Sequence, residues 1–273
     1  MSSAWDPARY LAFADERSRP FVDLIARIPD GDPDARPARV VDLGCGPGHL
    51  TAQLTARWPD ASVLGVDSSA AMIERAEAEA VGPGVDFELA DLRAWLVEAA
   101  PGQVDVLVSN ATLQWVPDHL DLLPSLVAAI RPGGVFAIQV PGNFAEPSHA
   151  ILEQLAAQPR YRDHTAAAPR PWAHDAVTYG RALRALGCEV DAWETTYLHV
   201  LRGRNPVFTW VSATGARPVL DALPDELRPG FEAAYRARLR AAYPAEADGS
   251  VVFGFRRVFV VARTPRARRE DGR

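Results

Sequence analysis

Between residues 39 and 140, short apolar segments alternate with segments that have the composition of helices. This alternation limits the fold more than any other feature of the chain. The apolar segments are Arg39–Leu43, Ser62–Val66, Val85–Leu89, Val104–Val108 and Val135–Val140, and the helix-like segments are Leu50–Trp58, Ser69–Ala80 and Leu120–Ile130. Strands that alternate with helices predict a doubly wound parallel sheet. We expect the last of these helices to end at Arg131-Pro132-Gly133-Gly134, because proline cannot continue a helix and glycine suits a turn.

The second half of the chain is less regular. Glu189–Leu201 and Val251–Ala262 alternate as strands do, and the prolines of Pro141–Arg181 predict a loop with short helices. Between the two late strands, helices are predicted from Asn205 to Thr214 and from Asp225 to Tyr243. Asn205 is expected to cap the first of these helices, with Pro206 in its first turn. This helical insertion looks like a lid over one edge of the sheet.

Charge argues against a nucleic-acid partner. The 273 residues carry a net charge of −6, and every one of the 29 basic residues is arginine. The final segment Arg263–Arg273 holds five arginines against Glu270 and Asp271, a balance of +3, so the rest of the chain carries −9. Such an acidic body is a poor partner for a phosphate backbone. The basic tail is predicted to be solvated and disordered.

A membrane, a disulfide framework and a structural zinc site are not expected either. The chain has no run of 18 apolar residues, and Met1–Tyr10 has no apolar segment typical of a secretory signal. Its two cysteines, Cys45 and Cys188, are too few for a disulfide framework or a four-ligand zinc site. We therefore expect a cytoplasmic protein without a bound metal.

A glycine loop carries the strongest binding signal. Val41-Asp42-Leu43-Gly44-Cys45-Gly46-Pro47-Gly48 joins the first predicted strand to the first helix, where open α/β sheets bind ligands. Glycines at these positions let the backbone approach a ligand closely. A dinucleotide fingerprint has its third glycine one residue later than Gly48. The Asp42 carboxylate would also repel a pyrophosphate but attract a cation, such as the ammonium and sulfonium of S-adenosylmethionine. The D-L-G-C-G-P-G segment resembles the first motif of Rossmann-like methyltransferases.

Two further acids follow the next strands. Asp67 ends the second strand, 23 residues after Gly44, where a carboxylate can accept both ribose hydroxyls. NAD enzymes use the same arrangement, and Asp67 could also cap the following helix. Asp91 follows the third strand. In the methyltransferase arrangement its carboxylate accepts a hydrogen bond from the adenine amino group, while the Leu92 amide donates one to a nitrogen of the adenine ring. Taken alone, Asp91 could be a solvated turn residue.

The loop after the fourth strand is expected to face the sulfonium of the cofactor. It reads Ser109-Asn110-Ala111-Thr112-Leu113-Gln114-Trp115. This is not the N-P-P-Y/F pattern of enzymes that methylate amino nitrogens of bases, so nucleobase and glutamine substrates are disfavoured. Trp115 could equally pack beneath the loop.

Taken over most of its length, the chain resembles the trans-aconitate 2-methyltransferase family. Beside the cofactor motifs, the resemblance rests on segments spread from Trp5 to about Arg263. They are Trp5-Asp6-Pro7, Glu16-Arg17-Ser18-Arg19-Pro20, Pro117-Asp118-His119, Glu146-Pro147, Gly187–Asp191, Thr195-Thr196-Tyr197 and Trp210–Pro218. The E-R-x-R-P and A-T-G-x-R-P segments are the most specific of these, and Thr165–Val177 departs from the family pattern.

The resemblance implies a Rossmann-like methyltransferase sheet, mostly parallel with its last strand antiparallel, and a helical lid. It implies one methyltransferase domain over residues 1–264, with an N-terminal cap at 1–30, a cofactor-binding core at 38–140, a lid insertion at 202–248 and a disordered tail at 265–273. S-adenosyl-L-methionine would be held by residues of the strand-end loops and the second helix. They are Asp42, Gly44, Gly46, Gly48, Asp67, Ser68, Met72, Asp91, Leu92 and Asn110.

The implied reaction is methyl transfer to one carboxylate of trans-aconitate. A carboxylate is already ionised at pH 7, so no general base is needed and no catalytic residue beyond positioning groups is expected. Proximity alone can contribute roughly 7–11 kcal/mol. Three carboxylates call for arginine, which binds them bidentately. The candidate substrate contacts are Arg17, Arg19, Arg217, Tyr10, Tyr197, Gln114 and Trp115, with Arg256 and Arg257 behind the arginines. His119 and His149 are expected to be structural.

Three alternatives remain at this stage. The chain could esterify another small carboxylate or a malonyl thioester on a carrier protein, although its acidic body disfavours an acidic carrier. It could be a non-catalytic S-adenosylmethionine-binding module, which the intact acids Asp42, Asp67 and Asp91 oppose. An NAD-dependent enzyme is opposed by the glycine spacing. The expected partner is a small tricarboxylate, and the expected assembly is a monomer or a weak homodimer.

Overall fold

The computed structural model describes residues 14–29, 36–79 and 84–266. Its contacts divide the chain into two compact units. We call residues 14–140, 174–194 and 258–266 the sheet unit, and residues 141–173 and 195–257 the helical unit. The long strands β6 and β7 contribute residues to both.

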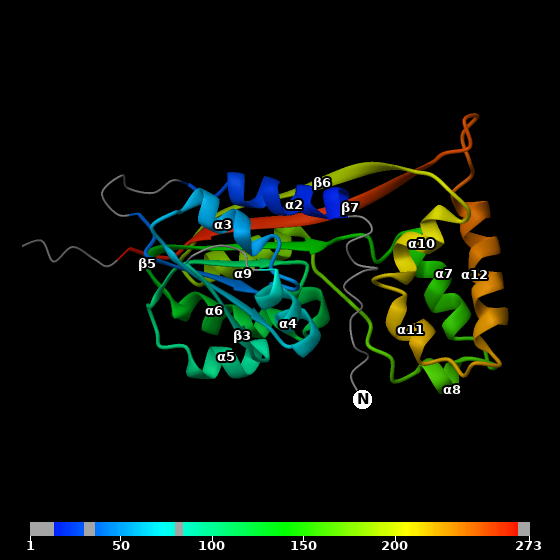
Figure 1. Ribbon diagram of the computed structural model, residues 1–273, viewed down its shortest axis with the longest axis horizontal. Coiled ribbons are helices and arrows are strands. Elements are labelled where there is room, and N and C mark those ends of the chain that lie inside the picture. The colour runs from blue at the N-terminus through cyan, green and yellow to red at the C-terminus, as the bar shows by residue number, and fades with distance from the viewer. Residues whose placement is uncertain (1–13, 30–35, 80–83, 267–273) are drawn as a thin grey trace, which may run out of the picture. The chain divides into compact units, whose positions relative to one another are not determined.

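Seven strands form one sheet in the order β3-β2-β1-β4-β5-β7-β6 (Figure 1). Neighbours from β3 to β5 pair in parallel, and β7 runs opposite to β5 and β6. The mostly parallel sheet with an antiparallel last strand is thereby confirmed. The strands are β1 (Arg39–Leu43), β2 (Ser62–Asp67), β3 (Val85–Leu89), β4 (Val104–Asn110), β5 (Ile130–Pro141), β6 (Glu189–Leu201) and β7 (Val251–Arg263).

Within the sheet unit, one helix precedes the first strand and the others lie between later strands. They are α2 (Ala14–Ala26), α3 (Thr51–Arg57), α4 (Ala70–Ala78), α5 (Leu92–Glu98), α6 (Leu123–Ala129) and α9 (Ala176–Ala185). The chain steps from β1 outward to β3 through α3 and α4, and then returns to β4 and β5 through α5 and α6. Right-handed crossovers therefore place these two pairs of helices on opposite faces of the sheet. The reversal of strand order between β1 and β4 is where such sheets bind ligands.

The segment Arg131-Pro132-Gly133-Gly134 ends α6 as expected but belongs to a strand. Helix α6 stops at Ala129, and β5 already begins at Ile130. The pairing with β4 shifts register here, because Val104 pairs with Ile130 but Val106 pairs with Val135. The extra residues form an irregularity of the bulge type, which a proline can occupy because its nitrogen has no ladder hydrogen bond to lose.

The core of the sheet unit lies around the central strands. Val40, Val41, Leu43, Val106, Leu107 and Val108 are buried, as are Phe136, Ala137, Ile138 and Val140 of β5. Strands covered on both faces read as continuous apolar runs, which is why the sequence pattern located them so well. Asp42 and Gln139 interrupt these runs with polar side chains, and both are almost fully buried.

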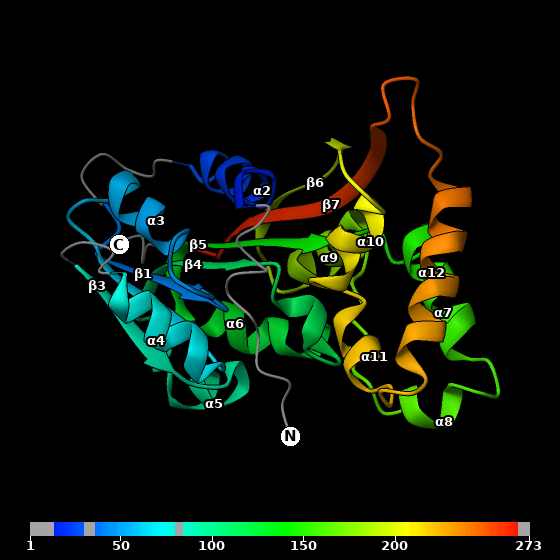
Figure 2. The ribbon, with the colours of Figure 1, turned by 45° about the vertical axis from the view of Figure 1, so that its right-hand side comes forward.

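The helical unit has a separate, aromatic-rich core between the helices labelled in Figure 2 and the ends of β6 and β7. Its helices are α7 (Pro147–Ala156), α8 (Arg162–Thr165), α10 (Pro206–Ser212), α11 (Arg217–Asp221) and α12 (Arg228–Ala242). Trp210, Phe231, Tyr235 and Phe253 are all but fully buried within it. The insertion expected at 202–248 thus holds three of the five helices, and its role as a lid stays a prediction.

Asn205 holds the N-cap position of α10 with Pro206 in the first turn, as predicted, but its side chain does not cap the helix. The helix begins at Pro206, but Asn205 takes a left-handed conformation (φ 54°) and its side chain makes no capping hydrogen bond. Its Oδ1 instead accepts a hydrogen bond from Arg240 of α12, at 2.6 Å. A contact between two helices therefore replaces the local cap.

Among the described residues, no helix is long and apolar enough to cross a membrane. The same part of the chain holds no group of three or more metal-ligating side chains of the His, Cys, Asp or Glu type. Both cysteines are buried thiols without a disulfide.

Candidate functional site

The glycine loop after β1 uses its three glycines in two different ways. Gly44, Gly46 and Gly48 all have positive φ angles, of 80°, 57° and 78°. A Cβ on Gly44 would lie 2.0 Å from Oγ1 of Thr112, and one on Gly48 would lie 2.7 Å from Cζ of Phe87. A Cβ on Gly46 would meet nothing within 4 Å. Gly44 and Gly48 are therefore required by packing, whereas Gly46 borders open space that a ligand could enter.

Asp67 joins this loop to the following helix. Its Oδ2 accepts a hydrogen bond from the Gly46 amide at 2.9 Å, and its Oδ1 accepts one from the Ser69 amide at 2.9 Å. Burial nevertheless raises the pKa of Asp67 above its ordinary value. The capping position of α4 is Ser69 rather than Asp67. The carboxylate thus lies at the open side of the loop, where an acceptor for hydroxyl groups is expected.

Asp42 lies deeper than the sequence implied. It is 2% exposed and accepts a hydrogen bond from the Thr51 hydroxyl at 2.7 Å. Burial raises the pKa of Asp42 to about 7, a rise opposed by the Thr51 hydrogen bond and supported by the charge of Asp67. A nearby cation would favour its ionised form. Asp42 can therefore act through its field on a cationic ligand.

Asp91 caps α5, so it is not merely a solvated turn residue. Its Oδ1 accepts hydrogen bonds from the amides of Arg93, at 2.8 Å, and Ala94, at 3.4 Å. No hydrogen bond to Oδ2 occurs within the described ranges, and the residue is exposed. One oxygen thus holds the carboxylate in place and the other is available to a donor. Leu92 is buried, and so is Met72 of α4, whereas Ser68 is exposed.

The loop after β4 is tied to the glycine loop. Thr112 Oγ1 donates to the Gly44 carbonyl at 3.3 Å, and Ser109 Oγ donates to the Leu43 carbonyl at 2.9 Å. Ala111 has a positive φ of 54°, which is strained for a residue with a Cβ. Such strain persists only where the surroundings enforce it. The β4 loop is thus held in a defined position beside the loop that carries Gly46.

Buried amide groups gather at the ends of β4 and β5. Asn110 and Gln139 are paired across these strands, and Gln114 follows on the β4 loop with its Nε2 donating to the Ala111 carbonyl at 2.6 Å. Asn110 Oδ1, Gln114 Oε1 and both amide atoms of Gln139 have no hydrogen-bond partner in the part of the chain that the structure describes. Leaving such groups unsatisfied costs about 1–3 kcal/mol each, so a ligand is the natural partner.

Gln139 was missed by the sequence reasoning. The available signal was a single amide within the apolar run Val135–Val140. Asn110 and Gln114 were predicted to be site residues, and the structure places them in the same group of amides. Trp115 is half-buried in a 3₁₀ turn that covers Leu113–Trp115. It therefore fits either reading, packing beneath the loop or contacting a substrate.

The predicted substrate-binding residues lie in different parts of the chain. Arg19 is an exposed residue of α2 in the sheet unit. Tyr197 of β6 and Arg217 of α11 belong to the helical unit, where Tyr197 is 5% exposed. Arg217 Nε pairs with Asp221 Oδ2 at 3.2 Å. Tyr10 and the side chain of Arg17 lie outside what the structure describes.

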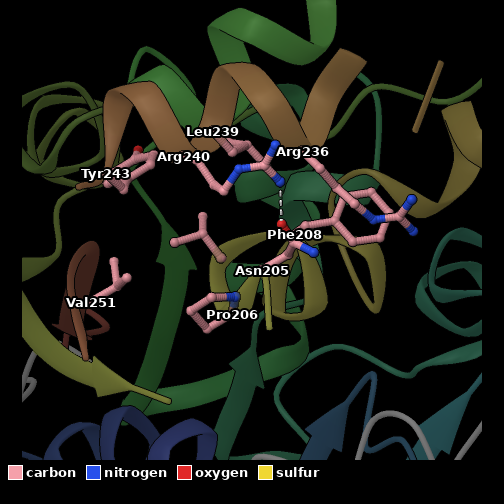
Figure 3. Close-up of a pocket in the computed structure, with 9 residues that line it drawn as sticks. Asn205, Pro206, Phe208, Arg236, Leu239, Arg240, Tyr243 and Val251 are labelled. Atoms are coloured by element: carbon pink, nitrogen blue, oxygen red, sulfur yellow. Dashed lines mark hydrogen bonds between the residues drawn. The ribbon is translucent and has the colours of Figure 1, made fainter. Parts of the chain in front are cut away.

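A pocket of about 240 Å³ lies within the helical unit (Figure 3). Both arginines of the pocket already interact with other groups of the protein. Arg240 donates a hydrogen bond to Asn205. Arg236 pairs with Glu232 at 2.5 Å, and its guanidinium lies 3.9 Å from the centre of the Phe208 ring. Leu239, Tyr243 and Val251 complete much of its wall. Because both charges are already engaged, this pocket is a weaker candidate for a carboxylate than its composition suggests.

Comparison with known proteins places the chain in a family. A model of the methyltransferase domain matches residues 13–192. A trans-aconitate 2-methyltransferase of Streptomyces avermitilis is 49% identical, over 95% of this chain and 96% of the relative. The chain belongs to the trans-aconitate 2-methyltransferase family. Further relatives with this name occur in Streptomyces coelicolor (51% identical; 96% and 87% covered) and Mycobacterium tuberculosis (45%; 98% and 100%).

Solved structures support the same fold at much lower sequence identity. The YcgJ protein of Bacillus subtilis aligns with a TM-score of 0.56 at 13% identity, over 92% of this chain and all of that one. A phosphoethanolamine N-methyltransferase of Haemonchus contortus, solved in complex with S-adenosyl-L-methionine, aligns with a TM-score of 0.53 at 17% identity, over 91% of this chain and 53% of that one. Both similarities concern the fold alone.

Proposed function

We propose that this protein transfers the methyl group of S-adenosyl-L-methionine to one carboxylate of trans-aconitate and releases the monomethyl ester. The observation that carries the proposal is the glycine loop with its acids. Gly46 borders open space, Asp67 lies at the same point, and Asp42 is buried behind the loop. Membership of the family supplies the substrate, because its relatives are named for trans-aconitate.

The residues present fit this cofactor. Asp67 would accept hydrogen bonds from the ribose hydroxyls, and Asp91 Oδ2 would accept one from the adenine amino group. The Leu92 amide would donate a hydrogen bond to a nitrogen of the adenine ring. Gly44, Gly46 and Gly48 would allow close approach, with Ser68 and Met72 beside them. The unpartnered Oδ1 of Asn110 is an acceptor that suits a cationic group. Bound there, the cofactor supplies an electrophilic methyl group.

The protein's own contribution is positioning and desolvation. A carboxylate acceptor is ionised at neutral pH and needs no base. Attack on a sulfonium brings opposite charges together and neutralises them, so a site that excludes water favours it. Arg17, Arg19 and Arg217 are proposed to hold the substrate carboxylates, with Tyr10, Tyr197, Gln114 and Trp115 completing the contacts.

The broader assignments belong to the same proposal. We infer a small tricarboxylate as the only partner required, with action in the cytoplasm as a monomer or weak homodimer. Neither a nucleic acid nor a membrane takes part. The charge of −9 outside the basic tail supports the exclusion of a nucleic acid.

The test is incubation of the full chain with methyl-labelled cofactor and a panel of mono-, di- and tricarboxylates. Trans-aconitate is expected to give a labelled monomethyl ester, detected by mass spectrometry, at a higher kcat/KM than any monocarboxylate. An equally good monocarboxylate would contradict the arginine clamp. No ester from any carboxylate, together with normal cofactor binding, would instead favour a binding module.

A further inference from the structure

A buried amide on β5 has no role in the function as proposed so far. Gln139 is 0% exposed, and neither atom of its side-chain amide has a hydrogen-bond partner within the described residues. Its backbone carbonyl is engaged, because it accepts a hydrogen bond from the Ala111 amide at 2.8 Å. The backbone of Gln139 is therefore fixed, while its side chain keeps one donor group and one acceptor open. A buried amide left in this way costs free energy, so a binding partner is expected.

Two further amides are tied to the same turn at Ala111. Asn110 precedes Ala111 and pairs in register with Gln139, and the Nε2 of Gln114 donates to the Ala111 carbonyl at 2.6 Å. Ala111 itself is held at a strained φ of 54°. The Oδ1 of Asn110 and the Oε1 of Gln114 are buried and accept no hydrogen bond in the part of the chain that the structure describes. One strained turn of the sheet unit thus anchors all three amides.

Asn110 and Gln139 do not satisfy each other, although they are neighbours. Register partners on adjacent strands leave the sheet on the same face, and the strands are about 4.8 Å apart. Two amides at that spacing could share a hydrogen bond, but both stay open among the residues that the structure describes. With Gln114 included, the buried open atoms are three oxygens and one NH₂ group. Such a set suits an occupant that brings a cationic and an anionic group together.

The order of the strands places these amides beside the proposed cofactor site (Figure 2). Along the sheet, β3, β2 and β1 are followed by Asp91, Asp67 and the glycine loop, which are proposed to hold the cofactor. Strands β4 and β5 come next, on the side of β1 away from β2. Since the loop after β4 is expected to face the sulfonium, a group that attacks the methyl carbon would lie over the ends of β4 and β5. Asn110 and Gln139 occupy those ends.

We propose that Gln139 and Asn110 form a neutral subsite for the substrate carboxylate that accepts the methyl group. The Gln139 NH₂ group donates a hydrogen bond to the carboxylate oxygen that does not attack, and the open oxygens of Asn110 and Gln114 suit the positive charge of the cofactor. A guanidinium paired with the attacking carboxylate would offset its charge, whereas an amide orients it and leaves the charge in place. Arginine remains suited to the carboxylates that do not react. The inference rests on the proposed methyl transfer.

Gln139→Met tests the donor, because methionine keeps an unbranched side chain of similar length but offers no N–H group. We expect kcat/KM for trans-aconitate to fall at least 10-fold, with affinity for S-adenosylmethionine within threefold of wild type. The unfolding temperature of the ligand-free variant should equal or exceed that of the wild type, because an unsatisfied buried amide has been removed. A merely structural amide would give the opposite result, with lower stability and weaker cofactor binding. Gln103→Met, at an exposed glutamine of the same unit, is the control and should change none of these quantities.

Gln139→Glu tests the same donor with a polar side chain of unchanged shape. Burial raises the pKa of a carboxyl group, and the protonated form offers an O–H donor to the substrate, whereas the ionised form repels a carboxylate. The loss of kcat/KM, expressed relative to the wild type at the same pH so that other titrating groups cancel, should therefore grow as the pH rises from 6 to 9. Gln103→Glu should follow the wild type throughout. A loss that is the same at every pH, or no loss, would overturn the role of the donor.

A binding measurement separates failure of this inference from failure of the proposed function. With S-adenosylhomocysteine bound, trans-aconitate should raise the unfolding temperature of the wild type. Half of that rise should need at least 10-fold more trans-aconitate in Gln139→Met than in Gln103→Met. If the wild type forms the ester but Gln139→Met keeps kcat/KM within threefold, the subsite is overturned and the proposed function stands. If the wild type forms no ester, the proposed function fails and this titration alone decides: equal titrations of the two variants, or no rise in the wild type, then overturn the subsite.

Discussion

The sheet unit and the helical unit hold their polar groups in different places. In the sheet unit, Asp67 is the last residue of β2 and Asp91 follows β3, and each is oriented by backbone amides. In the helical unit, Tyr197 and Arg257 lie on the strands themselves and are buried. Strand-end loops recur in sequence as motifs, whereas a buried polar residue on a strand leaves only a break in an apolar pattern. Cofactor binding is therefore readable from sequence, and substrate recognition is much less so.

Removing the Asp67 carboxylate should give the largest effect and tests whether strand-end acids carry the cofactor. Asp67→Ala removes the acceptor proposed for two ribose hydroxyls, each worth roughly 1.5–3 kcal/mol. We expect affinity for S-adenosylmethionine to fall at least 100-fold by calorimetry. Asp60→Ala, at an exposed residue of the same unit, should change nothing. Affinity within threefold of wild type in Asp67→Ala would contradict the assignment.

The ionised carboxylate of Asp42 should destabilise the folded chain and strengthen the binding of a cationic cofactor. Because its pKa is about 7 in the folded chain and near 4 when unfolded, ionising it costs folding free energy at every pH above about 4. That cost grows to a plateau above pH 7, at up to about 4 kcal/mol. Asn at this position retains an acceptor for Thr51 and carries no charge.

Asp42→Asn should therefore raise the unfolding temperature of the cofactor-free protein at pH 8 and leave it nearly unchanged at pH 4. The same variant should bind S-adenosylmethionine more weakly. In the wild type, affinity for S-adenosylmethionine should rise as the pH increases from 6 to 8, because a cationic ligand favours ionised Asp42. Binding should therefore release a proton, which calorimetry in buffers of different ionisation enthalpy detects. A variant that is destabilised at pH 8 would show that Asp42 is held ionised by groups beyond those seen here.

The glycine loop allows packing to be separated from binding. Gly48→Ala should destabilise the fold by about 2–4 kcal/mol, because strain at a positive φ adds to overlap with Phe87. Gly46→Ala should cost only about 1–2 kcal/mol, since its surroundings are open. Cofactor affinity should respond in the opposite order among molecules that remain folded. Urea unfolding and calorimetry on both variants measure this, and equal effects on affinity would remove the special role of Gly46.

The sequence predicted the strands of the sheet unit closely because buried parallel strands leave continuous apolar runs. It predicted the loop Asp42–Gly48 because backbone geometry there demands glycine. Prediction from the sequence failed where contacts between residues far apart in the chain determine the role of a side chain. Asn205 looked like a cap, but Arg240 on another helix takes its side chain. Gln139 and Asn143 carry no motif, and only their burial without partners identifies them. Tertiary contacts of this kind cannot be read from local pattern.

The smallest expected effect concerns the helical unit and its histidines. His149 of α7 lies against Gly215, where a Cβ would be 2.8 Å from Nε2, and its Nδ1 is 3.2 Å from Ser148 Oγ. Burial lowers the pKa of His149 to about 4. Between pH 6.5 and 4 the unfolded chain therefore binds a proton that the folded chain does not, so stability falls as the pH falls through this window.

Replacing His149 should remove that part of the pH dependence without touching cofactor binding in the sheet unit. As the pH falls from 7.5 to 5.5, the free energy of unfolding should decrease by about 1 kcal/mol less in His149→Gln than in the wild type. Measuring the free energy of unfolding of both proteins at each pH tests this. His164→Gln, at an exposed histidine of α8, is the control and should follow the wild-type curve. If His149→Gln also follows that curve, His149 accepts a proton in the folded chain as easily as in the unfolded one. The helical unit would then hold an ionisable imidazole beside Gly215, and His149 would join the candidates for contact with a carboxylate.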